Sequence, residues 1–470
     1  MERRFEVRKE ELLAGCEVPP ELFDGMLWRL GKFVEPFLGS LFRSEGREHA
    51  NTYVAGLLSN LKRKNAEAIA YRHDEERMGV QTFVGQSPWD HRPLVQELVR
   101  QVGSELGQAD AVIVFDPSGF PKKGVKSVGV ARQWLGRLGK VDNGQVGVYM
   151  AYASRVEHTL VDTRLYLPKG WTKDKKRSKE AGVPKDEMRF RTRHQLALEM
   201  LDDHAEMLPH AWVAGDDEMS RSTRFRWDLA DRPEQYLLAV PSNTTIRDLE
   251  EKPPNSAGRG GQRKVPFRQV RKWLDQLPKD AWTSIKVRDG DKEPLSVEIL
   301  SRRVQAKTEK RRVGPEETLV VIRYQEESGD VKHDYYLSNA SAKTSLKEFA
   351  QVSKEAPRIE ESIKRGKSEA GLADYQVRNW LGWHHHQVLS LIAVWFLVLE
   401  GLRGKKWTPA ITVPQLREAF STMIHQAWKC HTQQQLIRER ERKLRRNELA
   451  RFYHYKARKK LAPLRLTQKE

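Results

Sequence analysis

Three acidic residues that lie far apart in the chain have the type and setting that metal-assisted phosphate chemistry requires. Asp116 follows the apolar run AVIVF, Asp216 follows the apolar run WVAG, and Glu360 lies in the charged stretch RIEESIKRGK. Carboxylate oxygens are ligands that Mg²⁺ prefers in proteins. Two such ions about 3.5–4 Å apart activate the attacking oxygen and stabilise the leaving oxygen in phosphodiester cleavage. If the fold gathers these carboxylates, they predict a two-metal site.

Each of these residues also has an ordinary structural interpretation. Asp116 opens the segment DPSGFP, whose Asp, Pro, Ser and Gly residues all favour turns. Glu360 precedes Lys364 by one helical turn, so the two could form an ion pair on a solvated helix. Asp217 adjoins Asp216, and we choose Asp216 because it directly follows the predicted strand. The elements around these residues decide between the interpretations.

The order of the predicted elements places both aspartates at one edge of a sheet. From about residue 110 the pattern predicts a strand, AVIVFD, and then three strands joined by short turns as an antiparallel meander. An amphipathic helix, RTRHQLALEMLDDHAEML, and another short strand, AWVAG, follow. This is the order of an RNase H-like core. Sites in α/β sheets form outside the carboxyl ends of strands, where Asp116 and Asp216 lie.

We therefore predict an α/β protein, with an RNase H-like mixed sheet flanked by helices, an inserted β-rich subdomain, and helical N- and C-terminal regions. Residues 1–105 are predicted to form a helical DNA-binding domain, and residues 106–405 the core. A β-rich insertion is predicted to interrupt the core at about 230–345, where loop-like basic stretches precede two strands joined at SGD. Residues 406–470 are predicted to form a helical, basic C-terminal region.

The charge of the chain indicates a polyanionic partner. Lys and Arg number 83 against 64 Asp and Glu, which gives a formal net charge of +19. The charged N-terminus lacks the apolar core of a signal peptide, and the longest apolar stretch, VLSLIAVWFLVL, is too short to span a bilayer. Nucleic acid is therefore favoured over a membrane. Only two cysteines occur, which suits a reducing cytoplasm.

Other conspicuous residues have simpler expected roles. Residues 438–460 carry 11 Lys and Arg against 3 Glu, so they predict a solvated helix or a tail that contacts phosphates. The run His384, His385 and His386 favours packing or DNA contact over metal binding, because consecutive helical residues point about 100° apart. Trp273 and Trp282 could stack on an unpaired base, although core packing is favoured.

Three blocks of the sequence, taken together, resemble the DDE transposases of bacterial insertion sequences. The first is FDPSGFPKKGVKSVGVARQWLGRLGKVDNGQVGVY, and the second is WVAGDDEMSRSTRFRWDL. The third is RIEESIKRGKSEAGLADYQVRNWLGWHHHQ, in which six residues separate Glu360 from Lys367 as in the glutamate block of that family. The blocks occur in the family's order, and the resemblance runs from about residue 50 to about residue 400.

The resemblance implies a nuclease core in which Asp116, Asp216 and Glu360 are both the catalytic residues and the metal ligands. It implies two Mg²⁺ ions, with Mn²⁺ as a substitute, and double-stranded DNA of the element ends and of the target as partners. A homodimer on DNA and a bacterial cytoplasmic location, with the nucleoid when bound, are expected. The residues expected to contact DNA phosphates are Lys122, Lys123, Lys367 and Arg378.

The implied function is therefore a transposase that binds the ends of its insertion sequence, cleaves DNA and transfers the strands into target DNA. One alternative is a transposase-derived DNA-binding regulator with a silent site, and the three intact carboxylates argue against it. Another is a general RNase H-like nuclease or resolvase. The chain length, the insertion and the basic terminal regions argue against that alternative.

Overall fold

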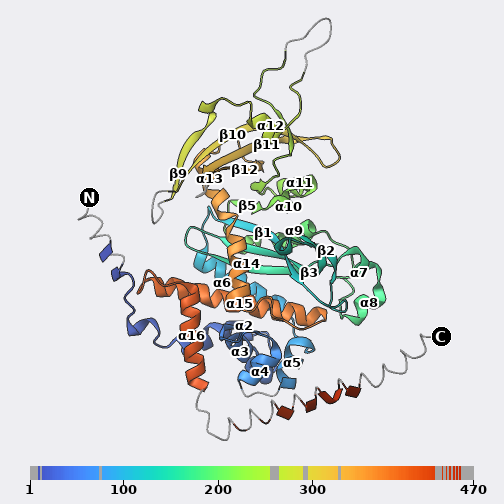
Figure 1. Cartoon of the computed structure of the whole chain (residues 1–470), viewed down its shortest axis with the longest axis vertical. Coiled ribbons are helices and arrows are strands. Elements are labelled where there is room, and N and C mark those ends of the chain that lie inside the picture. The colour runs from blue at the N-terminus through green and yellow to red at the C-terminus, as the bar shows by residue number, and fades with distance from the viewer. Residues whose placement is uncertain are drawn as a thin grey trace, which may run out of the picture.

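The structure is a computed structural model that describes residues 9–10, 13–73, 77–254, 264–288, 295–325, 330–428 and scattered positions between 437 and 456. A sheet of 12 strands runs through it, with helices packed on both of its faces in the core region (Figure 1). The predicted α/β fold class is confirmed. The predicted domain boundaries at 105 and 405 stay predictions, and most of the basic stretch 438–460 lies outside the described residues.

The core sheet has the order β4-β3-β1-β5-β6. Strand β3 is antiparallel to β1, whereas β1, β5 and β6 are mutually parallel, and β2 pairs with the first residues of β3. This is the RNase H-like arrangement predicted from the order of the segments. The strands are β1 (Val112–Pro121), β2 (Ala131–Leu135), β3 (Lys140–Ala153), β4 (His158–Leu165), β5 (Trp212–Gly215) and β6 (Tyr236–Ala239).

Strand β1 is longer than the sequence indicated. A turn was predicted after Asp116, but β1 continues to Pro121 and pairs with β3 along that whole length. The pairing of β1 with β5 ends at Phe115, and no described strand pairs with that edge of β1 beyond it. Along a strand, the backbone nitrogens of every second residue point to the same edge. Proline lacks an N–H, and Pro117 and Pro121 are four residues apart, so both nitrogens can face the unpaired edge of β1. Asp116 therefore lies within a strand, where the parallel pairing stops.

The two faces of the core sheet are covered by different helices. Asp116 pairs across the strands with Tyr149, so their side chains share a face. The Tyr149 hydroxyl donates to Gln387 of α15 at 2.7 Å, which places α15 on that face. Helix α14 packs beside it against β1, β3 and β4. The helices here are α13 (Leu346–Glu355), α14 (Arg358–Glu369) and α15 (Trp380–Lys405).

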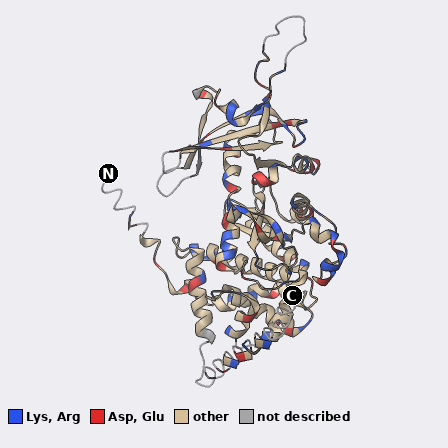
Figure 2. Cartoon of the chain, turned by 45° about the vertical axis from the view of Figure 1, so that its right-hand side comes forward, with Lys and Arg blue, Asp and Glu red and all other residues tan. Residues whose placement is uncertain are grey.

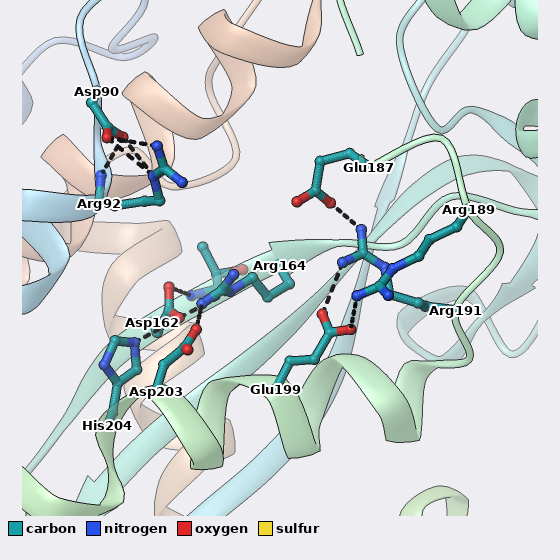
Figure 3. Close-up of polar contacts among 11 residues, drawn as sticks. Asp90, Arg92, Asp162, Arg164, Glu187, Arg189, Arg191, Glu199, Asp203 and His204 are labelled. Atoms are coloured by element: carbon teal, nitrogen blue, oxygen red, sulfur yellow. Dashed lines mark hydrogen bonds and ion pairs between the residues drawn. The ribbon is translucent and has the colours of Figure 1, made fainter. Parts of the chain in front are cut away.

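Helix α9 (Arg193–His204) covers the other face and is held there by ion pairs (Figure 3). Buried Asp162 of β4 contacts His204 at 3.0 Å and Arg164 at 3.1 Å, and Arg164 reaches Asp203 at 2.6 Å. Burial alone would raise the pKa of the Asp162 carboxyl, but Arg164 and His204 hold it well below its usual range. This charged contact fixes α9 against β4, with the short helices α7 (Lys169–Lys173) and α8 (Lys175–Glu180) preceding it.

The N-terminal helices form a bundle around α15. Helix α15 is long and apolar enough to cross a membrane by length and composition, but 83% of its most apolar window is buried inside the protein. Arg29 of α2 pairs with Glu400 of α15 at 2.7 Å. The bundle contains η1 (Pro20–Leu22), α2 (Met26–Leu38), α3 (Ser44–Leu58), α4 (Ala66–Arg72), α5 (Arg77–Gly85), α6 (Arg92–Leu106) and α16 (Val413–Trp428).

The three consecutive histidines of α15 are packing residues, as favoured from the sequence. His384, His385 and His386 are all buried, and each accepts or donates hydrogen bonds to protein groups. His385 contacts the carbonyl oxygens of Val84 and Trp89, both at 2.9 Å. Burial lowers the pKa of all three rings. These contacts join α15 to the N-terminal bundle.

The β-rich insertion has its own apolar core but shares the sheet. Strand β12 pairs with β6, so the sheet continues through β12, β11, β10, β7 and β8. Trp273 is buried in the insertion core and donates its indole N–H to Asp248 at 3.0 Å, whereas Trp282 is partly buried. Lys and Arg are spread over both the insertion and the core (Figure 2). Its elements are β7 (Thr245–Asp248), β8 (Arg268–Gln269), α12 (Val270–Leu274), η4 (Lys279–Ala281), β9 (Thr283–Arg288), β10 (Leu295–Lys307), β11 (Val313–Gln325) and β12 (Val331–Ser338).

Candidate active site

The two aspartates predicted as metal ligands follow equivalent positions of neighbouring strands. The parallel register of β1 and β5 ends with Phe115 opposite Gly215, so Asp116 and Asp216 are the next residue on each strand. Parallel strands end at the same edge of a sheet, and this edge is where the prediction placed the site. The structure thus brings together two carboxylates that are 100 positions apart in the sequence.

Asp216 and its neighbour Asp217 have different roles. Asp216 caps the short helix α10 (Asp217–Ser220), and its Oδ1 accepts from the backbone N–H of Glu218 and of Met219, both at 3.1 Å. The second oxygen of Asp216 takes no part in that cap. Asp217 instead pairs with the exposed guanidinium of Arg221, one helical turn later. These contacts support the choice of Asp216 for the site.

Helix α14 carries the third carboxylate and a cation to the same face of the sheet. Lys367 donates from Nζ to the Ser118 hydroxyl of β1 at 2.8 Å, and Ser118 lies two positions after Asp116 on the same face. Glu360 lies two turns before Lys367 on α14, with its side chain exposed. The helix predicted for this stretch is therefore present, and it crosses β1 next to Asp116.

The pKa of the Asp116 carboxyl is raised by burial and by neighbouring carboxylates. Burial raises the pKa of the Asp116 carboxyl well above its usual value. Repulsion from Asp216 and Glu360 raises that pKa further, and Lys367 opposes the rise. Burial, together with Glu218 and Asp217, also raises the pKa of Asp216 to about 6. Carboxyls that resist ionisation in this way are typical of sites that bind cations or transfer protons.

Comparison with known proteins shows the family of the chain. The family model described as DDE superfamily endonuclease matches residues 36–294, which is more than half of the chain. The chain belongs to the DDE superfamily endonucleases. The matched span contains Asp116 and Asp216 and ends before Glu360. The family resemblance inferred from the three sequence blocks is confirmed.

Two individual proteins are also similar to this chain. One is the "Probable transposase for insertion sequence element IS701" of Microchaete diplosiphon, 38% identical over 125 residues. That match covers 25% of this chain and only 32% of the relative. The other is the cryo-EM structure of the piggyBac transposase synaptic complex with hairpin DNA. It is 11% identical with a TM-score of 0.38, over 86% of this chain and 78% of that chain.

A fourth carboxylate lies near Asp116 and was not predicted from the sequence. Glu218, two residues after Asp216, also raises the pKa of Asp116. Its side chain pairs with Arg193 at the start of α9, and its backbone oxygen lies 3.2 Å from His194 Nε2. The sequence signal was only its position in the turn after β5. Because Arg193 already neutralises Glu218, we do not count it among the metal ligands.

The chemistry of these donors fits a divalent cation. Asp116 and Asp216 offer hard oxygen ligands, and repulsion among the carboxylates is unfavourable until a cation neutralises it. Within the described residues, no three His, Cys, Asp or Glu side chains are already arranged as a metal site. The carboxylates are therefore neighbours that a cation would still have to draw together.

The predicted phosphate-contacting residues occupy different environments. Lys122 lies with its Nζ 3.5 Å from the centre of the Tyr375 ring, and burial lowers the pKa of Lys122 to about 8. Lys123 and Arg378 are exposed. Lys367 of α14 is partly buried, and its side chain reaches Ser118 of β1. Lys123 and Arg378 are thus open to a ligand, whereas Lys122 is held by packing.

A buried polar network positions α14 at its N-terminal half. His158 of β4 lies 2.6 Å from the Ser362 hydroxyl through Nδ1. Its Nε2 lies 3.3 Å from both Glu157 and Glu361. Burial lowers the pKa of His158 to about 4, so the ring is neutral at physiological pH and acts as a hydrogen-bonding bridge. This network fixes the turn of α14 that carries Glu360.

Proposed function

We propose that this endonuclease is a transposase that binds the ends of its own insertion sequence, cleaves DNA and joins those ends to target DNA. The observation that carries the proposal is the placement of Asp116 and Asp216 directly after Phe115 and Gly215, where the parallel pairing of β1 and β5 ends, with Glu360 close enough to raise the pKa of Asp116. The similarity to a protein named as an insertion-sequence transposase favours transposition over general DNA cleavage.

The chain's own residues would divide the chemistry among them. Asp116, Asp216 and Glu360 would hold two divalent ions, Mg²⁺ or Mn²⁺, which when bound supply activation of the attacking oxygen and stabilisation of the leaving oxygen. Lys367 would place a positive charge beside the reacting phosphate, since it already interacts with both Asp116 and Ser118. Exposed Lys123 would contact the backbone of the bound strand.

The proposed partners follow from charge and from the reaction. A formal net charge of +19 supports binding to double-stranded DNA, both at the element ends and at the target. Two ends must be held together during strand transfer, and a homodimer on DNA is the simplest assembly that does so. A bacterial cytoplasmic location, with the nucleoid when DNA is bound, accords with this partner.

Excision from a model substrate tests the proposal. The purified chain would be incubated with Mg²⁺ and DNA that carries the element with both flanking ends, and the products would be resolved on a gel. We expect excision and strand transfer by the unaltered protein. Asp216→Asn should abolish cleavage but spare DNA binding, because it removes one carboxylate and no cationic surface. Asp217→Asn is the matched control and should retain cleavage.

Other outcomes would point to a different function. DNA binding with no cleavage by the unaltered protein, in Mg²⁺ and in Mn²⁺, would contradict a transposase and favour a silent DNA-binding regulator. Cleavage without any preference for the element ends would favour a general RNase H-like nuclease. Full cleavage by Asp216→Asn would exclude the assigned site.

A further inference from the structure

The hairpin that joins β10 and β11 ends in a basic turn that the proposed cleavage chemistry does not use. Lys310, Arg311 and Arg312 occupy this turn and are all exposed. Among the described residues, no carboxylate forms an ion pair with any of these three. Unpaired cations clustered at a hairpin tip repel one another, so their concentration here indicates an anionic ligand.

The backbone conformation of the turn is unusual for the arginine at position 311. Thr308 donates its N–H to the Arg312 oxygen at 2.9 Å and accepts from the Arg311 N–H at 2.8 Å. Arg311 has a φ of 57°, in the left-handed region where hairpins of this kind favour Gly or Asn. An arginine there is disfavoured by the local backbone. Residues that break a local rule in this way often serve a ligand.

The tip of the hairpin is anchored to the start of the helix that follows α10. Glu309 accepts a hydrogen bond from the backbone N–H of Thr223 at 2.6 Å, at the start of α11 (Thr223–Asp231). Helix α10, which Asp216 caps, immediately precedes α11. The tip therefore stands at a fixed position next to α10, and Figure 1 shows β10 and β11 above α10 and α11.

A cavity of about 420 Å³ lies between the hairpin and these helices. Phe267 lies under Lys307, whose Nζ is 4.8 Å from the ring centre, so the ring supports the cation at the cavity wall. Cations and hydroxyls dominate the lining, and its carboxylate, Glu309, is already engaged with Thr223. The lining cations are Arg221, Arg226, Lys307 and Arg311, and the lining hydroxyls include those of Thr244 and Thr245. Arg221 already pairs with Asp217 and Arg226 with Glu317, which leaves Lys307 and Arg311 without an ion pair among the described residues.

We propose that this cavity binds a backbone phosphate of the DNA strand, next to the cleavage site but separate from the carboxylates. Lys307 and Arg311, together with several hydroxyls, match the charge and the acceptor oxygens of a phosphodiester. The proposal rests on the proposed function, since it takes DNA as the substrate of the chain. Because phosphate contacts carry no base sequence, the cavity should hold the strand without reading it.

Arg311→Gly separates a ligand-binding role from a structural one. Glycine suits the left-handed conformation, so the turn should be kept and the melting temperature should stay level or rise by about 2 °C. DNA affinity of the full chain, measured by fluorescence anisotropy in Ca²⁺ without cleavage, should fall roughly 3- to 10-fold. The slope of log affinity against log salt should become shallower by about 0.9, as for one lost phosphate contact.

Two further variants control the measurement. Arg311→Lys keeps the charge and should keep most of the affinity. Arg100→Gln removes one charge from the surface of α6, where Arg100 has a side chain 60% exposed, and should leave the affinity unchanged. The loss in Arg311→Gly should be equal on element-end DNA and on random duplex of the same length.

Opposite results would overturn the phosphate site. Affinity of Arg311→Gly equal to that of the unaltered chain, or no lower than that of Arg100→Gln, would exclude it. A loss of affinity accompanied by a lower melting temperature would show that Arg311 supports the turn instead. Failure of the unaltered chain to cleave element ends would overturn the transposase, whereas a selective binding loss in Arg311→Gly would still support the phosphate site.

Discussion

Replacing Asp216 by Asn should stabilise the metal-free protein at neutral pH, although it removes a catalytic group. The pKa of Asp216 is raised from 3.8 to about 6, so ionisation of this carboxyl is disfavoured in the folded state. A shift of about 2 pKa units corresponds to roughly 3 kcal/mol in the free energy of unfolding. Because Asp216 is partly exposed and solvent screens its charge, we expect the variant to gain about 2 kcal/mol. Asparagine keeps the oxygen that caps α10, so the helix start should be preserved.

The sign of the pH dependence follows from the direction of the shift. A carboxyl with a raised pKa binds its proton more tightly when folded, so its ionisation costs stability as the pH rises from about 4 to about 6. Below that window the folded carboxyl is protonated and the variant has no advantage. Above it the full cost is present, and the variant avoids that cost. The stability difference should therefore appear between pH 4 and 6 and stay constant above.

Thermal unfolding in EDTA from pH 4 to pH 8 measures this difference. Asp216→Asn should melt roughly 2–5 °C above the unaltered chain at pH 8 and at nearly the same temperature at pH 4. Addition of Mg²⁺ should reverse the order, because only the unaltered chain gains stability from the bound ion. Asp217→Asn loses the pair with Arg221 and one minor contribution to the raised pKa of Asp216, so it should show much smaller effects. Equal or lower stability of Asp216→Asn at pH 8 in EDTA would refute the reasoning.

Lys367→Met should raise the pKa of Asp116 further, because Lys367 opposes that rise. Mg²⁺ should then begin to protect the variant against thermal unfolding only at a higher pH than it protects the unaltered chain. Protection that begins at the same or a lower pH would contradict this. Arg226→Met should cost roughly 3–5 kcal/mol in urea unfolding because it leaves Glu317 buried without its cation, 2.8 Å away; a cost under about 1 kcal/mol would show that the pair is dispensable. Truncation after Gln435 should weaken binding to all DNA and make the salt slope shallower by about 0.9 for each lost phosphate contact, whereas a loss confined to element ends would argue against a non-specific role.

The core of the fold could be predicted because its signals are local. Short apolar runs such as AVIVF and WVAG are buried on both faces of a parallel sheet, which leaves a continuous apolar pattern. The order of such runs along the chain predicted that Asp116 and Asp216 lie at one edge of the sheet. Glu360 could be placed on a helix because its neighbours repeat with helical spacing.

The supporting contacts of the site could not be predicted because they join distant residues. Glu218 meets Arg193 from 25 positions away, and His158 meets Ser362 from 204 positions away. No periodicity encodes such pairs. The extension of β1 past Asp116 depends on which edge of the strand stays unpaired. That is a property of the whole sheet, so the local sequence does not reveal it. Likewise, the basic segment before α9 forms the two short helices α7 and α8, which no apolar periodicity indicates.

The pairing of β12 with β6 has a consequence for synthesis of the chain. Leu238 pairs with Leu337, which is added about 100 residues later. At roughly 5–20 residues per second, β6 would wait about 5–20 s on the ribosome before its neighbour strand exists. During that time the nascent core presents an apolar strand with an open edge, which can pair with another nascent chain. Polysomes that make this protein should therefore depend on chaperones more than the compactness of the finished core suggests.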